Sequence, residues 1–292
     1  MTESSAHTTN PFHPGSQRPY QEWRARKLDA YPHAPDTLMV DVADLTQPSQ
    51  DERQAIIAAC RRANMAIFTA AAGTADKADL RAFGRHFGLA RLDANLYADD
   101  DGITALQVSD VDRKRDFIPY TNQRLNWHTD GYYNTPDRQI RGLVMFCVRD
   151  AAEGGENQLL DHEIAYIQLR DLNPEFIAAL MQADAMTIPA RMDEDNVARA
   201  EQSGPVFAID LELGFLYMRY TARTRSIVWK NDAVTQAAVK ALADILANSE
   251  YILTARLRPG MGLICNNVLH TRSGFSDSPE HRRLLYRGRY YD

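Results

Sequence analysis

The sequence predicts a mainly β protein with helices, of the α+β class, whose core is a β-sandwich or jelly roll with flanking helices. Many short apolar runs rich in β-branched residues follow one another between turn residues, and the longest spans residues 140–148. In residues 50–64 the apolar side chains instead recur at three- and four-residue spacing, which is typical of an amphipathic helix. The chain has 292 residues, without an internal repeat or a clear linker. We therefore predict one domain over residues 20–292.

The N-terminal part of the chain is predicted to contain both helices and strands, and the rest is predicted to be mostly strands. Turn residues and the period of the apolar pattern predict helices at residues 21–30, 50–64, 76–87, 163–181 (interrupted near Pro174) and 233–247. The same signals predict strands at residues 38–42, 65–69, 140–148, 186–189, 206–209, 215–220, 226–229, 251–257, 261–266 and 284–291.

Composition and charge exclude several classes of function. The net charge is −6 and no Lys/Arg tract occurs, so we expect no nucleic-acid partner. Three distant cysteines in apolar stretches predict small buried thiols in a reducing compartment. Residues 1–19 are polar and rich in Pro, Ser and Thr, which predicts a disordered arm rather than a signal peptide. No apolar run approaches a membrane span, so we expect a cytoplasmic protein without a membrane partner.

The tripeptide His128-Thr129-Asp130 is the first candidate for chemistry. On an extended segment His128 and Asp130 project from the same side, because side chains alternate with period two. A third ligand would complete two imidazoles and one carboxylate, the set typical of non-heme Fe(II) oxygenases. Such tripeptides also arise by chance, but an aromatic residue before the His and Gly131 after the Asp fit a strand that ends at a metal.

Two segments near the C-terminus supply the rest of the candidate site. His270 follows an apolar strand that begins after the turn Pro259-Gly260. If residues 284–291 form a strand, then Arg283, Arg287 and Arg289 share one face. Arginines turned toward an interior are costly unless an anion neutralises them, and a guanidinium binds a carboxylate in a bidentate fork. The alternative is a solvated stripe on an edge strand, which we prefer for Arg289.

The set His128, Asp130, His270 and Arg283 resembles the Fe(II)/2-oxoglutarate dioxygenases of the taurine dioxygenase and 2,4-dichlorophenoxyacetate dioxygenase type. The segment Asn126-Trp127-His128-Thr129-Asp130 is close to the motif of that family, and ordered landmarks run from about residue 60 to the C-terminus. The long separation of Asp130 from His270 also suits this branch. The resemblance implies a double-stranded β-helix, or jelly roll, as the core fold.

The resemblance also implies the cofactors and the roles of individual residues. His128, Asp130 and His270 would hold Fe(II), with 2-oxoglutarate and O2 as co-substrates. Arg283 would bind the distal carboxylate of 2-oxoglutarate. The family commonly has Thr where this chain has Asn157, after Gly154-Gly155-Glu156; an Asn157 amide N–H donating to the same carboxylate would replace it, whereas Gly154-Gly155 is equally well explained as a plain turn.

Substrate contacts are predicted less directly. Arg287 matches the place where taurine dioxygenase holds the sulfonate of its substrate, with a structural ion pair as the alternative. Arg124 lies where that enzyme has a side chain that contacts the substrate. Tyr133, Tyr217 and Arg219 are further pocket candidates, although such residues on strands often only pack. Asn266 and Asn267 are candidates for orienting His270.

These observations predict an oxygenase that hydroxylates a small anionic molecule and releases succinate and CO2. Desaturation or C–S, C–O or C–N cleavage on the same iron site stays open, as does a catalytically silent binding protein. The substrate, a homo-oligomeric state and a lid formed by residues 88–125 are not decided by the sequence.

Overall fold

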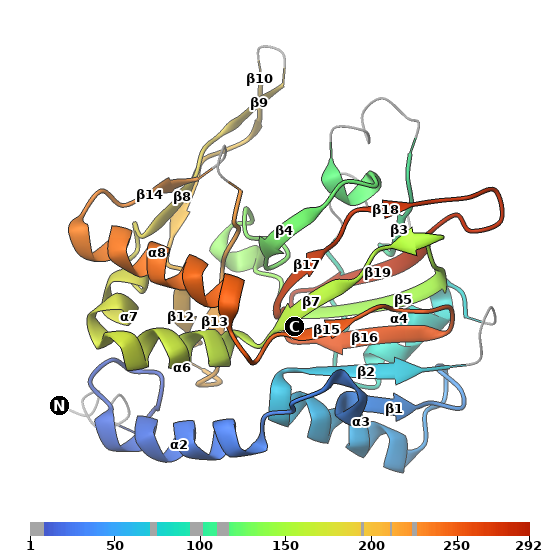
Figure 1. The fold of residues 1–292 in the computed structure, drawn as a ribbon, viewed down its shortest axis with the longest axis horizontal. Coiled ribbons are helices and arrows are strands. Elements are labelled where there is room, and N and C mark those ends of the chain that lie inside the picture. The colour runs from blue at the N-terminus through green and yellow to red at the C-terminus, as the bar shows by residue number, and fades with distance from the viewer. Residues whose placement is uncertain are drawn as a thin grey trace. The chain divides into compact units, whose positions relative to one another are not determined.

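The computed structural model describes residues 9–70, 75–93, 102–109, 117–193, 196–210, 212–223 and 227–292. The chain divides into two compact units (Figure 1). Unit 1 consists of Met1–Tyr31, Gly131–Thr135 and Leu160–Ile252. Unit 2 consists of Pro32–Asp130, Pro136–Leu159 and Leu253–Asp292. Each unit is described by itself below.

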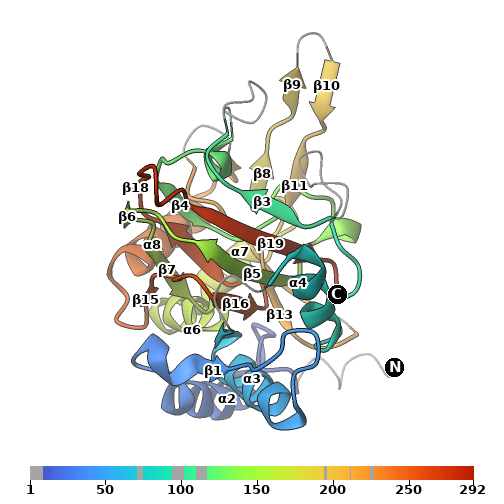
Figure 2. The same ribbon diagram turned by 90° about the vertical axis from the view of Figure 1, so that its right-hand side faces the viewer.

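The larger sheet of unit 2 has six strands in the order β1-β2-β16-β5-β19-β3, labelled in Figure 1; Figure 2 shows β3, β19 and β5 of this sheet from another side. The bounds of its strands are β1 (Met39–Asp41), β2 (Met65–Thr69), β3 (Thr104–Leu106), β5 (Gly142–Arg149), β16 (Met261–Cys265) and β19 (Leu284–Tyr290). The β1–β2 pair is parallel, and the other pairs are antiparallel. Strands β5 and β16 are buried along most of their length, as their continuous apolar runs predict.

Unit 2 also contains a four-stranded sheet of order β15-β7-β17-β4 and a two-stranded pair of β6 and β18. The bounds are β4 (Leu125–His128), β6 (Glu153–Gly154), β7 (Asn157–Leu160), β15 (Leu253–Ala255), β17 (Leu269–Arg272) and β18 (Phe275–Ser276). The described part of unit 2 also has three short 3₁₀ helices: η1 (Pro35–Leu38), η2 (Ile118–Tyr120) and η3 (Pro136–Arg138).

Two capped helices pack on the six-stranded sheet. Helix α3 (Gln50–Ala63) begins with a capping box of Ser49 and Glu52, and it contacts β2. Helix α4 (Lys77–Arg85) begins with a second capping box and contacts β5 and β19. Gly84 of α4 lies against the ring of Tyr290 on β19. Because side chains alternate along a strand, the arginines of β19 face away from α4.

Aromatic packing defines the core between α4 and the sheet. The ring of Phe68 on β2 lies 4.5 Å from that of Phe83 on α4 and 6.2 Å from that of Phe146 on β5. All three side chains are fully buried. Each such side chain stabilises the fold by about 1.5–3 kcal/mol relative to the exposed state. The sheet is thereby held firmly on the face opposite to the β19 arginines.

Among its described residues, unit 1 has four helices and three small sheets. The helices are α2 (Gln17–Ala30), α6 (His162–Leu172), α7 (Pro174–Leu180) and α8 (Ala233–Asn248). The paired strands are β8 (Met186–Ile188), β9 (Arg191–Asp193), β10 (Asn196–Arg199), β11 (Gln202–Gly204), β12 (Phe207–Ile209), β13 (Leu216–Met218) and β14 (Val228–Trp229). Their sheets have the orders β11-β8-β14, β10-β9 and β12-β13. Pro174 separates α6 from α7, because proline cannot donate the hydrogen bond that would continue the first helix.

The prediction of a disordered N-terminal arm is wrong for residues 9–19. Phe12 is buried, with its ring 4.8 Å from that of Trp23 and 5.9 Å from that of Tyr166. Helix α2 begins at Gln17, four residues before the predicted start. The polar composition suggested disorder, but one aromatic residue anchors the segment against α2 and α6. Residues 1–8 lie outside the described residues.

The predicted helices and strands are otherwise confirmed, with shifts of a few residues at their ends. Two short strands missed by the sequence reading, β7 and β17, prove to carry site residues. The buried thiols of Cys147 and Cys265 are also confirmed. A single domain over residues 20–292 stays a prediction. In the part of the chain that the structure describes, no helix is long and apolar enough to cross a membrane.

Candidate metal centre and co-substrate site

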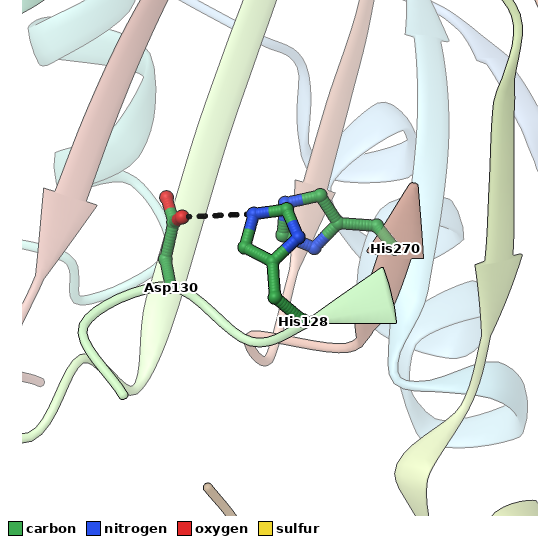
Figure 3. A group of neighbouring side chains, drawn as sticks. All are labelled: His128, Asp130 and His270. Atoms are coloured by element: carbon green, nitrogen blue, oxygen red, sulfur yellow. Dashed lines mark ion pairs between the residues drawn. The ribbon is translucent and has the colours of Figure 1, made fainter. Parts of the chain in front are cut away.

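Two histidines face each other across adjacent strands of the four-stranded sheet. His128 ends β4, and His270 is the second residue of β17. The two residues are register partners, and their ring centroids lie 4.1 Å apart (Figure 3). Both side chains are buried. The predicted convergence of these distant residues is therefore confirmed, and the pairing of β4 with β17 produces it.

Asp130 completes the group, but not through strand alternation. Strand β4 ends at His128, so Asp130 lies in the turn beyond it. Its carboxylate still points at His128, with 3.6 Å between Asp130 Oδ1 and His128 Nε2 (Figure 3). The backbone N–H of Asp130 donates to Asn267 Oδ1 at 2.8 Å. Contacts from another part of the chain thus hold Asp130, which corrects the expectation that a shared strand face would do so.

The ring nitrogens of both histidines have defined roles. His128 Nδ1 lies 2.9 Å from the carbonyl oxygen of Asn126, and His270 Nδ1 lies 3.0 Å from that of Val268. Since a carbonyl can only accept, each Nδ1 carries the proton and donates it. In a neutral ring of this tautomer, Nε2 carries the lone pair that a metal ion can bind. Burial, and then the neighbouring His128, lower the pKa of His270 to about 4, so its ring is neutral at neutral pH.

The Asp130 carboxylate is ionised despite its burial. Burial, the largest single influence, would raise the pKa of this carboxyl group, but Arg287, His128, Arg289 and His270 together outweigh it and hold the pKa well below its usual range. Arg287 Nη1 lies 3.0 Å from Asp130 Oδ2 and 3.4 Å from Oδ1. Among the described residues no donor makes a hydrogen bond of good geometry to Oδ2.

These three side chains fit a divalent metal ion. One ligand atom from each of His128, Asp130 and His270 lies within 4.8 Å of the others, and all three residues are buried. Two imidazoles whose Nδ1 atoms face backbone carbonyls, together with one ionised carboxylate, match the donor set of non-heme iron sites, which leaves further positions open. Each Nδ1–H is fixed by a backbone carbonyl, as is usual for histidines that bind metals.

Arg283 is a buried cation without an ion-pair partner in the described part of the chain. It directly precedes β19, and its guanidinium lies 5.1 Å from the centroid of the Phe275 ring. Burial lowers its pKa to about 10, so the group is still protonated at neutral pH. A buried guanidinium in this state is costly unless an anion binds it. Its surroundings therefore suit a carboxylate ligand.

The other two arginines of β19 are paired. Arg287 forms an ion pair with Asp130. In this structure it therefore makes the structural ion pair that was the alternative to a substrate contact. Arg289 is buried and forms an ion pair with Asp93. The preferred expectation of a solvated stripe on an edge strand is wrong for Arg289. Strand β19 lies between β5 and β3, and its arginines face inward.

Arg272 is a buried residue that the sequence reading missed. It lies two residues after His270 on β17, and its Nη2 donates to the carbonyls of Ile118, Thr121 and Gln123. Burial, and then the neighbouring Arg283 and Arg287, lower its pKa to about 9. The spacing His-x-Arg on a short apolar strand was the available signal. Arg272 ties the segment before β4 to the strand of His270.

The Gly154-Gly155-Glu156-Asn157 segment lies beside Arg283. Both glycines have positive φ, and a Cβ on Gly154 would lie 2.2 Å from the carbonyl oxygen of Gly274. A Cβ on Gly155 would lie 3.6 Å from Arg283 Nε. The glycines therefore allow a close approach of the chain to β18 and to Arg283, beyond forming a turn.

Asn157 is buried on β7 next to the same region, and its Nδ2 donates to the carbonyl of Thr271 at 2.7 Å. One amide N–H is thus already used, while the second stays free for a carboxylate. Asn157 Oδ1 accepts no hydrogen bond from the described residues. The predicted contact of Asn157 with 2-oxoglutarate therefore depends on that second N–H alone.

The remaining substrate candidates differ in their surroundings. Arg124, in unit 2, is exposed. It lies four residues before His128, so the alternation of side chains along β4 would place both on the same side of the chain. In unit 1, Tyr133 is half-buried under Arg199, whose guanidinium lies 5.5 Å from the ring centroid, and Tyr217 is half-buried on β13. Their predicted roles stay predictions.

Arg219, also in unit 1, is committed to the backbone. Its guanidinium donates to the carbonyls of Met186, Gly204, Pro205 and Gln202. These contacts favour a structural role, so we no longer propose Arg219 as a substrate ligand.

The two asparagines before β17 do not orient His270 as expected. Asn266 Nδ2 donates to Asn64 Oδ1 at 2.8 Å, at the C-terminal end of α3. Asn267 contacts Asp130 instead. The predicted lid at residues 88–125 includes residues 94–101 and 110–116, which lie outside the described residues.

Comparison with known proteins places the chain in a family. The profile of the "Taurine catabolism dioxygenase TauD, TfdA family" matches residues 25–289. A uridine-5'-phosphate dioxygenase of Amycolatopsis sp. is 29% identical over 170 residues, which cover 56% of this chain and 60% of that protein. A uridine-5'-phosphate dioxygenase of Streptomyces sp. is 30% identical over 198 residues, which cover 66% of this chain and 70% of that protein.

A solved structure shows the same fold at low sequence identity. It is asparagine oxygenase in complex with Fe(II), 2S,3S-3-hydroxyasparagine and succinate. The TM-score is 0.59 at 12% identity, and the match covers 87% of this chain and 93% of that one.

The chain belongs to the TauD/TfdA family of dioxygenases. The predicted resemblance to this family is thereby confirmed, and His128, Asp130 and His270 form a group that could hold a metal ion.

Proposed function

We propose that this protein is an Fe(II)- and 2-oxoglutarate-dependent oxygenase that hydroxylates a small anionic substrate. The observation that carries the proposal is the convergence of His128, Asp130 and His270 within 4.8 Å in a buried site. Arg283 adds a buried cation for the co-substrate in the same unit. The family match over residues 25–289 supports the reaction class.

The core of unit 2 is, in this proposal, the jelly roll expected from the sequence. Its six-stranded and four-stranded sheets are largely antiparallel. Arg287 on the first sheet forms an ion pair with Asp130, which follows β4 of the second sheet. This ion pair supports an arrangement in which the two sheets face each other at the site, as the layers of a β-sandwich do.

Each protein group has a definite task in this mechanism. The Nε2 atoms of His128 and His270 and the Asp130 carboxylate would hold Fe(II). When bound, the metal and 2-oxoglutarate supply oxidative decarboxylation, which consumes O2, gives succinate and CO2, and oxidises a substrate C–H bond. The backbone carbonyls of Asn126 and Val268 keep both imidazoles in the correct tautomer. Burial of all three ligands limits the access of water.

Arg283 would orient the co-substrate. A guanidinium can bind the distal carboxylate of 2-oxoglutarate through two parallel hydrogen bonds, which fixes both position and direction. Gly155 leaves room beside Arg283 Nε, and the second amide N–H of Asn157 is a further donor on the neighbouring β7. No acidic side chain of the described residues lies within ion-pair distance of Arg283 to compete with this carboxylate.

An anionic substrate is supported by the charge of the site. Arg272, Arg283 and Arg287 are all buried, against the single carboxylate of Asp130, and Arg283 and Arg287 lie close enough to Arg272 to lower its pKa. Two charges of Fe(II) and two of 2-oxoglutarate cancel, so this excess of positive charge remains after loading. Arg287 and Arg124 are the proposed contacts. The names of both curated relatives make nucleoside monophosphates the first class to screen.

The test is succinate formation from 2-oxoglutarate by the purified protein. We expect it to require Fe(II), to rise with the correct anionic substrate, and to be lost in His128→Ala, Asp130→Ala and His270→Ala. His86→Ala is the matched control, because this histidine contacts the carbonyl of Thr46 and none of the three ligands. Undiminished succinate formation in all three ligand variants would refute the metal assignment. Mass spectrometry of the product then shows whether one oxygen is gained, as hydroxylation requires.

A further inference from the structure

Asn267 is a buried polar residue beside the candidate metal ligands whose side chain bonds only to backbone. Its Oδ1 accepts from the N–H of Asp130 at 2.8 Å. Its Nδ2 donates to the carbonyl of Asp130 at 3.0 Å and to that of Ile140 at 2.6 Å. The amide of Asn267 thus binds both the N–H and the C=O of Asp130, and it links them to the carbonyl of Ile140, two residues before β5.

This contact holds the candidate ligand that the strand pairing leaves unconstrained. His128 and His270 are held by the β4–β17 ladder, but Asp130 lies beyond the end of β4 and has no ladder partner. Gly131 follows it with a φ of 66°, so the chain on that side turns sharply. Without another constraint the direction of the Asp130 carboxylate would be loosely defined, although a metal site needs its ligands held within fractions of an ångström.

The backbone of Asn267 is suited to this task. Its φ is 49°, in the left-handed region that asparagine tolerates better than most residues. It lies in the turn between β16 and β17, three residues before His270. The element that presents the second histidine therefore also carries the amide that holds the carboxylate. Only asparagine combines the conformation, one acceptor and two donors in a side chain of this length.

We propose that Asn267 is a positioning residue that sets the direction of the Asp130 carboxylate against His128 and His270, and so determines the affinity for the metal ion. This inference rests on the proposed function, since it assigns Asp130 as a ligand. It differs from the role expected from the sequence, in which Asn267 would orient His270. Arg287 contacts the carboxylate of Asp130, whereas Asn267 acts on its backbone.

The experiment measures metal affinity rather than turnover. Fe(II) binding under anaerobic conditions, and Co(II) binding followed by its visible absorption, are compared in the wild type, Asn267→Gly and Asn267→Asp. Glycine accepts the left-handed backbone but lacks the amide. Aspartate keeps the acceptor for the Asp130 N–H and loses both donors. We expect both variants to bind metal about 10- to 100-fold more weakly, the range found when outer partners of metal ligands are removed.

Asn266→Ala is the matched control. It removes a side-chain hydrogen bond from the same turn, but the partner is Asn64 and not a ligand. We expect its metal affinity to stay within about twofold of wild type, with a smaller loss of thermal stability than in the Asn267 variants, because Asn266 is exposed and loses a single side-chain hydrogen bond. At saturating metal, Asn267→Gly should keep the wild-type KM for 2-oxoglutarate, because Arg283 is unchanged.

The outcomes separate this inference from the proposed function. If the wild type binds no divalent metal ion, the proposed function fails. If the wild type binds metal and Asn267→Gly and Asn267→Asp bind it equally tightly, only the role of Asn267 is overturned. The same holds if Asn266→Ala loses as much affinity as the Asn267 variants, since the effect would then follow general stability. If Asn267→Gly does not fold, the Asn267→Asp affinity and Co(II) spectrum decide the question.

Discussion

Arg170 in unit 1 and Arg283 in unit 2 are both almost completely buried, yet their guanidinium groups have different surroundings. Arg170 lies 3.9 Å from the ring centroid of Tyr20 and donates to the carbonyls of Pro11, Pro14 and Ser16. It also donates to the hydroxyl of Tyr166. Arg283 has the ring of Phe275 beside it and no comparable set of acceptors among the described residues.

The comparison shows that burial of an arginine does not by itself mark a ligand site. A buried guanidinium whose donors are used by backbone carbonyls stabilises the fold, as Arg170 and Arg219 do in unit 1. A buried guanidinium whose donors are unused is instead costly in the free protein and ready to bind an anion. The two classes therefore predict opposite effects of removing the side chain on stability and on ligand binding.

Arg170→Ala tests the class of buried arginines whose donors are used by backbone carbonyls. Of the four substitutions, it should lower the free energy of unfolding the most. We expect the free energy of unfolding to fall by about 4 kcal/mol, because several buried acceptors lose their donor at a cost of about 1–3 kcal/mol each. Urea denaturation followed by circular dichroism measures the change. A loss below about 1 kcal/mol would show that water replaces the guanidinium and that the N-terminal segment does not depend on it.

Arg219→Ala is the second structural test. Four carbonyls of β8, β11 and the segment after β11 receive its hydrogen bonds, so we expect a loss of about 3 kcal/mol in the free energy of unfolding. The KM values for 2-oxoglutarate and substrate should stay at the wild-type level. A raised substrate KM with unchanged stability would restore the substrate contact first predicted for this residue.

Arg283→Ala tests the ligand-binding class. We expect the KM for 2-oxoglutarate to rise about 30-fold, which corresponds to about 2 kcal/mol for hydrogen bonds to a charged group. The free protein should be as stable as the wild type or more stable, because an unpaired buried charge is removed. Arg283→Lys keeps the charge without the planar fork, so its KM for 2-oxoglutarate should lie between those of the wild type and Arg283→Ala. An unchanged KM in Arg283→Ala would rule out the co-substrate role.

Arg124→Ala should have the smallest effect, because this side chain is exposed. We expect stability to change by less than about 0.5 kcal/mol. The KM of an anionic substrate should rise about threefold at low salt, and less at high salt, as for a screened surface charge. A rise of the same size for the uncharged analogue of that substrate would contradict an electrostatic contact.

Periodicity and local signals were sufficient for most of the elements. The three-residue spacing of residues 50–64 and the polar residues before residue 77 predicted α3 and α4 closely, because capping and amphipathic burial act within a few residues. They were not sufficient for the polar segment at residues 9–16, which is held by burial of Phe12 against Trp23 and Tyr166 and by the hydrogen bonds that Arg170 donates to its carbonyls.

The sequence by itself determined the donor set, because His128, Asp130 and His270 are the residue types that a ferrous ion binds, and it singled out Arg283 for an anion. Only the tertiary structure decided which neighbour each of these groups receives. In the tertiary structure Arg287 forms an ion pair with Asp130, Arg289 forms one with Asp93, and the side chain of Asn267 binds the backbone of Asp130. The physical reason is that local patterns fix conformation within a few residues, whereas the partner of a buried polar group is set by strands that meet from distant parts of the chain.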